Sequence, residues 1–403
     1  MDPGPRADFN RAWTPALYRR YVDRVEESLG EVPFRLAETP FFVSPELRDS
    51  LGRSAVEIVA QLSRPALLAE LKQAIPDRYR APGMDALPNC VQVDFAVCPA
   101  PGGGLEGKLV ELQAFPSGYA MMHAFAQAWS EVLEPVPGLD GGWSCCVLPE
   151  CDALRLLGET ILGNEAPESV ALVDFEPKQQ KTRPDFVATR QLYGVEAVCA
   201  TDLIKDGRRL FRRGSDGRLV QVRRIYNRMV FDELERKALR LPFAWSDELD
   251  LSWCSHPNWY WTWSKVALPH LSHPAVPRAR LLSELDRPPE DLERYVLKPL
   301  FSFAGAGVVI DVTPEDIDRI PAGQRAEWIL QDKISYAPAI HAPDGIDVKA
   351  EVRVMMVRPP DAPALQPLMH LVRLSRGKML GVDQNKGLDW VGASVGLWRP
   401  LLG

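Results

Sequence analysis

The spacing of hydrophobic residues changes along the chain, and each change marks a different kind of predicted element. Between residues 13 and 75 apolar side chains recur at helical spacing, as at Leu17 and Tyr21, which predicts helices. Two later stretches, 90–97 and 108–115, instead alternate between apolar and polar residues on either side of a proline- and glycine-containing turn. This alternation predicts a β-hairpin. We expect the N-terminal helices to form a packing layer without chemistry.

The middle of the chain returns to helical spacing and then alternates between strands and helices. A helix is predicted at 121–132, followed by loop-rich sequence up to residue 165. Strand 170–173, helix 180–192 and strand 195–199 then follow one another. This order predicts a small α/β unit with a parallel sheet.

The last strand of this unit ends in polar residues that are candidates for binding. Residues 222–228 predict a strand that finishes with Asn227 and Arg228. Ligands of parallel sheets bind at the carboxyl ends of the strands, so Arg228 is a candidate for substrate or phosphate binding. A structural ion pair is the alternative. The aromatic cluster 259–263 is expected in a core or a lobe interface, and Lys265 after it is a further candidate for cofactor binding.

Strand patterns dominate the rest of the chain. A helix is predicted at 314–317, with Thr313 as its N-cap, and a short helix at 281–285. The segments rich in β-formers are 295–297, 308–310, 327–334, 350–357, 369–374, 379–382 and 392–398. Together these patterns predict a mixed α/β (α+β) fold.

Composition narrows the class of protein. A chain of 403 residues predicts two or three lobes, and 46% hydrophobic with 25% charged residues is ordinary for a soluble globular protein. The net charge of −7 argues against a nucleic-acid partner. We expect no membrane span, since no long apolar run occurs, and no signal peptide at the start. The seven cysteines lack zinc-site spacing and predict free thiols in a reducing cytoplasm.

The hairpin contains a candidate metal site. Glu111 and Gln113 are two residues apart in a predicted strand and therefore share one face. In simple register Asp94 lies across from them. Two carboxylates and an amide oxygen suit a hard cation such as Mg²⁺. The alternative is a solvent-facing polar side of the sheet.

The stretch 295–310 contains a candidate phosphate site. Lys298 stands at the end of a predicted strand and offers a point charge. A loop of small residues follows from Ser302 to Gly307, and its glycines leave backbone N–H groups open to an anion. A plain hairpin with a surface lysine is the alternative.

The order of these elements resembles the ATP-grasp superfamily. The matching features are the lysine strand with its glycine-rich flap, the strand 329–334, and the pair Glu351 and Arg353 on one face of a strand. The resemblance implies two sheets that clasp a nucleotide, with Arg353 or Arg373 stabilising the transferred phosphoryl group. The residues that it places at ATP are Lys298, Ser302, Gly305, Ala306, Gly307, Gln331, Asp332 and Lys333.

The early position of Asp94 and Glu111 is similar to the circularly permuted branch, which includes glutathionylspermidine synthetase-like amide ligases. In that pattern an aspartate and a Glu-x-Asn pair precede the lysine strand. Two residues depart from that pattern: Gln113 replaces the asparagine, and Gln92 stands where an arginine is expected. The alternative metal ligands are Asp383 and Asn385.

The resemblance covers about residues 88 to 403, and together with the helical pattern before it the chain is predicted to have five segments. They are a helical N-terminal layer (1–85), the carboxylate hairpin with helices (86–165), a parallel α/β domain (166–265), an ATP lid (266–333) and the remaining core strands (334–403).

The implied activity is an ADP-forming ligase that joins a carboxylate to an amine or thiol through an acyl phosphate, with ATP and Mg²⁺ as cofactors. Its substrates would be small-molecule or peptide carboxylates and amines, contacted by the loops 176–184, 226–232 and 335–349. Such chemistry needs positioning and charge neutralisation, and the chain has no Ser-His-Asp or Cys-His signature. A non-catalytic ATP-binding module and a phosphotransferase are the alternatives. The patterns indicate neither the substrate nor the oligomeric state.

Overall fold

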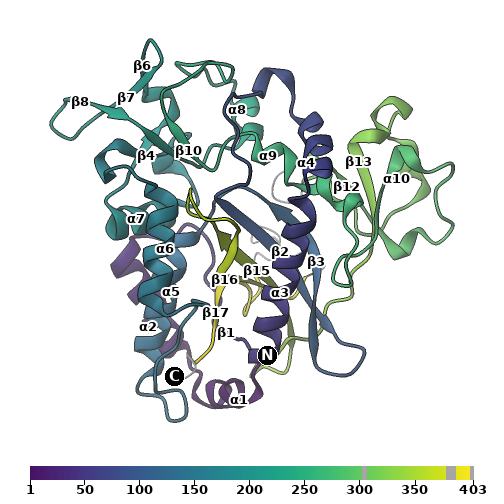
Figure 1. The fold of residues 1–403 in the computed structure, drawn as a ribbon. Helices are drawn as coiled ribbons and strands as arrows, with labels where there is room; N and C mark the ends of the chain where they lie inside the picture. Colours follow the sequence, from purple (N-terminus) through teal and green to yellow (C-terminus); the bar gives the residue numbers. More distant parts are fainter. Residues whose placement is uncertain (302–305, 378–386, 400–403) are drawn as a thin grey trace.

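The computed structural model describes residues 1–301, 306–377 and 387–399, and a mixed sheet lies at its centre (Figure 1). The strand order is β1–β17–β16–β15–β2–β3, and β14 pairs with β15. The strands are β1 (Phe41–Phe42), β2 (Cys90–Pro99), β3 (Leu105–Gln113), β14 (Ile340–His341), β15 (Asp347–Val357), β16 (Gln366–Ser375) and β17 (Gly392–Leu397). The predicted hairpin is therefore confirmed, and β15 extends it into a larger sheet.

The two faces of the central sheet differ in chemistry. Val352 and Phe95 lie opposite each other on neighbouring strands and belong to the main core. Helix α3 (Pro45–Leu62) packs on this face, where the side chain of Leu51 approaches Gly107 of β3. A Cβ atom at residue 107 would lie 2.3 Å from Leu51 Cδ2, so a larger residue there would force the Leu51 side chain to shift. The opposite face contains Asp94, paired in register with Arg353.

Several helices stand together beside the β17 side of the sheet (Figure 1). They are α2 (Pro15–Leu29), α5 (Tyr119–Leu133), α6 (Glu150–Leu162) and α7 (Arg183–Tyr193), with α1 (Pro3–Ala12) below them. Tyr21 of α2 stacks on Trp129 of α5 at a centroid distance of 3.9 Å. The loop-rich prediction that extended to residue 165 was wrong for α6, whose buried Ala153, Leu157 and Ile161 are spaced four apart. This periodicity was present in the sequence.

The predicted parallel α/β unit is confirmed. Its sheet has the order β10–β9–β4–β5, with every pair parallel. The strands are β4 (Val170–Asp174), β5 (Glu196–Cys199), β9 (Arg224–Asn227) and β10 (Ser252–Cys254), and α8 (Phe231–Arg236), α9 (Trp259–Thr262) and α4 (Pro65–Leu71) lie nearby. A small antiparallel sheet of β6 (Ile204–Asp206), β7 (Arg209–Arg213) and β8 (Leu219–Val222) projects from it (Figure 1).

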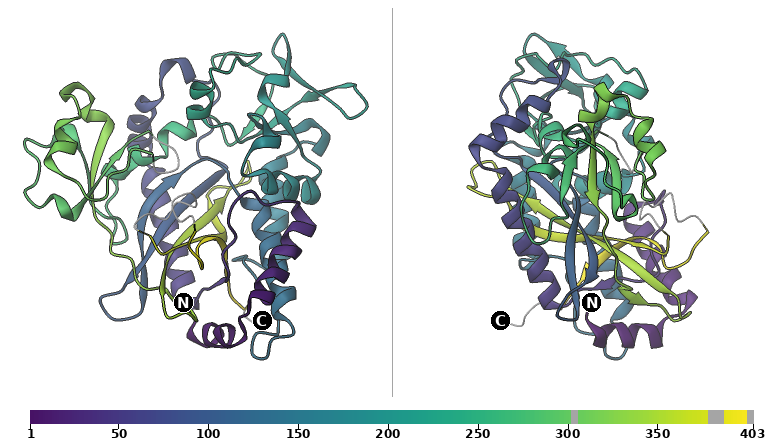
Figure 2. Two further views of the ribbon diagram at one scale, coloured as in Figure 1. Left: turned by 180° about the vertical axis from the view of Figure 1, so that it is seen from behind. Right: turned by 90° about the vertical axis from the view of Figure 1, so that its right-hand side faces the viewer.

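A third unit, which we call the side unit, projects from the molecule beside α3 and β3 (Figure 2). It consists of β11 (Ala279–Leu281), β12 (Tyr295–Pro299), β13 (Trp328–Asp332) and α10 (Pro314–Asp318). The sheet order is β11–β13–β12, all antiparallel. Thr313 caps α10 as predicted.

Two predictions in this region were wrong. Residues 308–310 form no strand, because Val309 makes only an isolated bridge to Leu297. Residues 281–285 were expected to be a short helix but end β11 and continue as a 3₁₀ turn (Leu282–Glu284). The strand predicted at 379–382 lies outside the described residues.

The hydrophobic cores show which face of the side unit packs against the central sheet. Ile329 of β13 belongs to the main core, whereas its neighbour Leu330 belongs to a separate core of the side unit. Lys298 pairs in register with Ile329, so it lies on the face of the side unit that turns toward the central sheet. Gln331 is two residues from Ile329 and shares that face.

The predicted burial of the tryptophan cluster is confirmed. Trp259 and Trp263 are fully buried in the main core, and Trp261 belongs to the core of the α/β unit. The cluster therefore joins two lobes. Among the helices of the described residues, none combines the length and apolar character that crossing a membrane requires.

Candidate functional site

The polar face of the central sheet contains a buried group of charges centred on Asp94. The guanidinium of Arg353 binds this carboxylate through both prongs, Nε to Oδ1 at 2.6 Å and Nη2 to Oδ2 at 2.7 Å. Arg373 of β16 donates a further hydrogen bond to Oδ2. Asp94 is 1% exposed. Burial alone would raise the pKa of this carboxyl, but Arg353 and Arg373 outweigh it and hold the pKa below its usual value.

Two glutamines extend this group along the hairpin. Gln92 Oε1 accepts hydrogen bonds from Arg353 Nη1 at 2.7 Å and from Gln113 Nε2 at 2.6 Å. Gln92 Nε2 donates to the carbonyl of Ser117. Both the oxygen and the nitrogen of the Gln92 amide are therefore hydrogen-bonded, and the amide links Arg353 to Gln113. We call Gln92, Asp94, Glu351, Arg353 and Arg373 the Asp94 network.

Glu351 lies at the other side of the network. It forms an ion pair with Arg373 at 2.9 Å and accepts a hydrogen bond from the hydroxyl of Tyr336 at 3.2 Å. Burial raises the pKa of Glu351, and the negative charges of Asp94 and Glu111 raise it further, whereas the positive charge of Arg373 lowers it. Burial and Glu351 also raise the pKa of Tyr336. The network is thus crowded with charge of both signs.

Lys298 reaches this region from the side unit. Its Nζ donates to the carbonyl of Val110 on β3 at 3.1 Å, and among the described residues it has no carboxylate partner within ion-pair distance. The residue is 8% exposed. Burial lowers the pKa of Lys298 to about 8, Lys265 adds to this effect, and the charges of Glu111 and Glu351 oppose it. The two lysines and two of the carboxylates therefore share one electrostatic environment.

The second half of the predicted nucleotide site lies along β13. Gln331 is 1% exposed, and its Nε2 has no hydrogen-bond partner in the described residues. Asp332 and Lys333 are exposed at the end of the strand, and Lys333 binds Asp311 at 3.1 Å. Ala306 and Gly307 are also exposed. The predicted residues outside the described part of the chain are Ser302, Gly305, Asp383 and Asn385.

Arg228 is placed in a different setting from the other predicted residues. It is 2% exposed and pairs with Asp185 at 3.2 Å, and it also donates to the carbonyl of Pro116 at 2.6 Å. Asp185 in turn accepts hydrogen bonds from the backbone N–H groups of Gly118 and Ala120 at the start of α5. This is the structural ion pair that the sequence left open as the alternative.

The donor set predicted for Mg²⁺ does not fit the arrangement of the described residues. Both oxygens of Asp94 are engaged by two guanidinium groups, so a cation there would face two positive charges. Only Glu111, whose carboxylate has no partner among the described residues, and the amide oxygen of Gln113 remain. No cluster of three or more acidic, cysteine or histidine side chains suited to a metal occurs in the described residues. The magnesium assignment stays a prediction.

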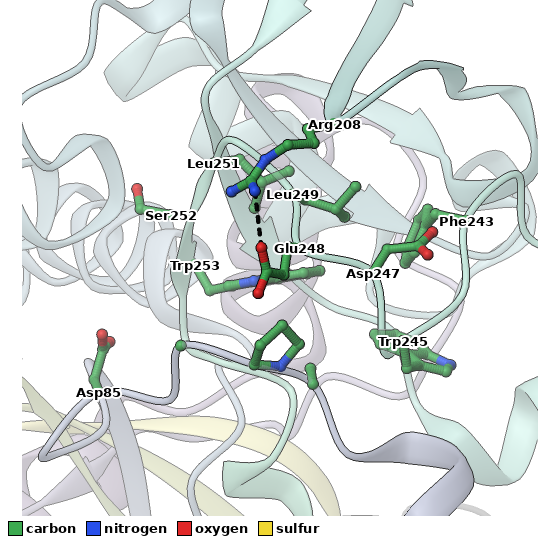
Figure 3. Close-up of a pocket in the computed structure, with 13 residues that line it drawn as sticks. Asp85, Arg208, Phe243, Trp245, Asp247, Glu248, Leu249, Leu251, Ser252 and Trp253 are labelled. Carbon is green, nitrogen blue, oxygen red and sulfur yellow. Dashed lines mark hydrogen bonds and ion pairs between the residues drawn. The ribbon is translucent and has the colours of Figure 1, made fainter.

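A cavity of about 430 Å³ lies elsewhere, in the α/β unit (Figure 3). Its lining is mixed and includes the aromatic residues Trp253, Trp245 and Phe243 together with the segment 81–83. The charged side chains are largely paired, as in the 2.8 Å contact of Arg208 with Glu248. None of the predicted site residues lines this cavity.

Sequence reasoning missed two contributors to the site, Gln92 and Tyr336, and also Asp185, the structural partner of Arg228. Gln92 was noted only as a departure, although it links Arg353 to Gln113. Tyr336 and Asp185 were not singled out at all. Neither has a local signal, because their partners lie far away in the chain: Tyr336 contacts a different strand, and Asp185 caps a helix that begins at Tyr119.

No protein-family model matches this chain, and no curated protein matches its sequence. Among solved structures, the chain is similar to a glutathione synthetase-like effector from Globodera pallida in its apo form. The TM-score is 0.59 at 11% sequence identity, with 96% of this chain and 98% of that chain covered. At this identity the likeness shows the fold. The chain therefore has a glutathione synthetase-like, ATP-grasp-like fold, which confirms the predicted fold class. The circularly permuted branch stays a prediction.

Proposed function

We propose that this chain binds ATP and acts as an ADP-forming ligase that joins a carboxylate to an amine or thiol. The observation that best supports the proposal is Lys298. Its ammonium is buried on the inward face of the side unit, with a carbonyl but no carboxylate partner among the described residues. A buried, unneutralised cation is costly unless an anion binds it. The phosphates of ATP are the anions that the ATP-grasp-like fold suggests.

The proposed reaction has two steps. A carboxylate oxygen of the substrate attacks the γ-phosphorus of ATP, ADP leaves, and an acyl phosphate forms. The amine nitrogen then attacks the acyl carbon, inorganic phosphate leaves, and the nitrogen loses a proton. Neither step needs a protein nucleophile, because positioning and charge stabilisation supply the catalysis.

The proposal assigns each residue a role that its position supports. Lys298 and Lys265 bind the phosphates, and Arg373 stabilises the transferred phosphoryl group, since its Nε is buried without a hydrogen-bond partner in the described residues. The backbone from Gln331 to Lys333 binds the adenine edge. Arg353 has its Nε, Nη1 and Nη2 bound to Asp94 and Gln92, so we assign it no direct contact with the phosphoryl group. No step is assigned to Mg²⁺.

The proposal is tested by ADP release. Purified protein is incubated with ATP and panels of carboxylates and amines, and a coupled assay measures ADP. We expect release that requires both substrates and that Lys298→Ala reduces at least about tenfold, the equivalent of 1.4 kcal/mol. Full activity of Lys298→Ala would overturn the assignment of the site.

A non-catalytic ATP-binding module is the second candidate. The observation in its favour is the Asp94 network, in which both Asp94 oxygens and the amide of Gln92 are already engaged. This candidate predicts ATP binding by calorimetry without ADP formation on any panel. A phosphotransferase would instead form a phosphorylated product without an amine, which a product assay lacking the amine would detect.

A further inference from the structure

Asp94 contacts one arginine from each of two strands on the same side of its own strand, the adjacent β15 and, beyond it, β16. It lies on β2, directly opposite Arg353 of β15 in the register of the sheet, and Arg373 reaches it from β16. Three guanidinium N–H groups point at its two oxygens. Asp94 thus accepts charge-assisted hydrogen bonds at both oxygens, the strongest kind in proteins.

The two arginines are held to different degrees. Arg353 has both sides of its fork on Asp94 and its remaining nitrogen on Gln92 at 2.7 Å, so its plane is fixed. Arg373 bridges Asp94 and Glu351, but 22% of its side chain is exposed, and its Nε is buried without a partner among the described residues. Arg373 therefore keeps donor capacity while Asp94 and Glu351 hold its guanidinium in place.

A divalent cation on Asp94 would have to break this arrangement. Hard cations take oxygens as ligands, and both Asp94 oxygens already neutralise guanidinium groups. The displaced arginines would remain buried beside the incoming cation, and a buried charge that loses its partner is strongly destabilising. Glu111 is half-buried and has no ion pair among the described residues that a cation would have to break.

We propose that Asp94 is a positioning residue that holds Arg373 against the nucleotide site, and that it is not a ligand of the divalent cation that accompanies ATP. This inference rests on the proposed function, because it concerns the same site. It assigns the role of orienting the arginines to Asp94, and it leaves Glu111 as the carboxylate that responds to a cation.

The experiment measures binding of the non-hydrolysable ATP analogue AMPPNP by calorimetry over a series of Mg²⁺ concentrations. For each variant it gives two quantities, the AMPPNP affinity at saturating Mg²⁺ and the Mg²⁺ concentration at half-maximal binding. The variants are Asp94→Asn, Arg373→Met, their combination, and Glu111→Gln. Asp140→Asn, an exposed aspartate outside the network, is the control.

Asp94→Asn should weaken AMPPNP about tenfold and leave the Mg²⁺ midpoint within about twofold of the wild type. In the Arg373→Met background, Asp94→Asn should cause little further loss, because two residues that act through one contact are non-additive. Glu111→Gln should raise the Mg²⁺ midpoint about fivefold or more. Should Asp94→Asn fail to fold, Arg373→Met still tests the inference, since it must weaken AMPPNP at an unchanged midpoint.

Two results would overturn the inference while leaving the proposed function in place. One is a Mg²⁺ midpoint raised fivefold or more by Asp94→Asn, which would make Asp94 a ligand. The other is full additivity of Asp94→Asn and Arg373→Met. If the wild type bound no AMPPNP at any Mg²⁺ concentration, the proposed function would fail as well.

Discussion

Asp94 and Asp185 are two buried aspartates paired with arginine, yet their surroundings differ. Asp185 is fully buried, and its partners are Arg228 and the backbone N–H groups at the start of α5. The carbonyl of Pro116 takes a further donor of Arg228. One carboxylate thus meets one guanidinium, and the charges balance.

The charges around Asp94 do not balance in this way. Asp94 forms ion pairs with two arginines, Arg353 and Arg373, and Arg373 also pairs with a second carboxylate, Glu351. Lys298 of the side unit lies in the same region and has no carboxylate partner in the described residues. The pKa of Glu351 is raised and that of Lys298 is lowered to about 8. The comparison teaches that a buried ion pair does not by itself indicate a binding site. A binding site is indicated where buried charges from two structural units meet and are not fully neutralised by one another.

The strongest test of this contrast is Asp185→Ala. It leaves Arg228 buried without its carboxylate and uncaps α5, so we expect the free energy of unfolding to fall by about 3–5 kcal/mol. Urea denaturation followed by circular dichroism measures this loss. A loss below about 1 kcal/mol would mean that the Asp185 pair is not the structural contact described here.

His370 lies on the apolar face of the central sheet, opposite the face that contains Asp94. It is fully buried, neither ring nitrogen has a hydrogen-bond partner among the described residues, and burial lowers its pKa to about 3. In the unfolded chain the imidazole takes up a proton near pH 6.5. The folded protein should therefore lose stability as the pH falls from about 6.5 toward 3, by about 2 kcal/mol between pH 6.5 and 5 from this group.

His370→Phe keeps the edge contact with Trp398 and removes the titration. Denaturation at pH 7 and pH 5 should show a smaller acid-induced loss for the variant than for the wild type. Equal losses would assign the acid sensitivity to other groups.

Lys298→Met tests the other region of the comparison, in which the charges are not balanced. Removing a buried ammonium also removes its desolvation cost, so the free energy of unfolding of the ligand-free protein should not decrease. ATP affinity, in contrast, should fall about tenfold or more. Thermal denaturation with and without ATP gives both quantities. A variant that loses stability and retains ATP affinity would show that Lys298 is structural.

The pH dependence of ATP binding gives a second test of the role of the Lys298 ammonium. The ligand-free pKa of Lys298 is about 8, and an anion beside the ammonium raises it. ATP binding therefore takes up a proton above that pKa, so affinity should be constant below about pH 7 and decline as the pH rises through 8. Lys298→Arg, which stays charged, should bind ATP with a flat profile over the same range. A wild-type profile that is flat to pH 9 would contradict the proposed role.

The sequence predicted those features that depend on local periodicity. Alternation placed Asp94 opposite Glu111 and put Glu351 and Arg353 on one face, and the structure agrees. The parallel α/β unit followed from strand–helix–strand order, because each element had a clear period. Thr313 was recognisable as a cap from its position before a proline-led helix.

The contacts of the site were not predictable in the same way. Periodicity gives the face on which a side chain lies, but it does not indicate which strand inserts beside it. Arg353 meets Asp94 only because β15 pairs with β2 across 259 positions of sequence. The bonds that Gln92 makes to Arg353 and Ser117 depend on the same pairing and on the loop before α5.

The central claim is that Lys298, which has no carboxylate partner among the described residues, and Arg373, which Asp94 and Glu351 hold in place, together bind ATP. Titration calorimetry of ATP, at pH 7 with Mg²⁺ present, tests it most directly when wild type and Lys298→Met are compared. The account predicts one binding site in the wild type and a loss of affinity of about tenfold or more in the variant. No binding to the wild type, or equal binding to both proteins, would contradict it.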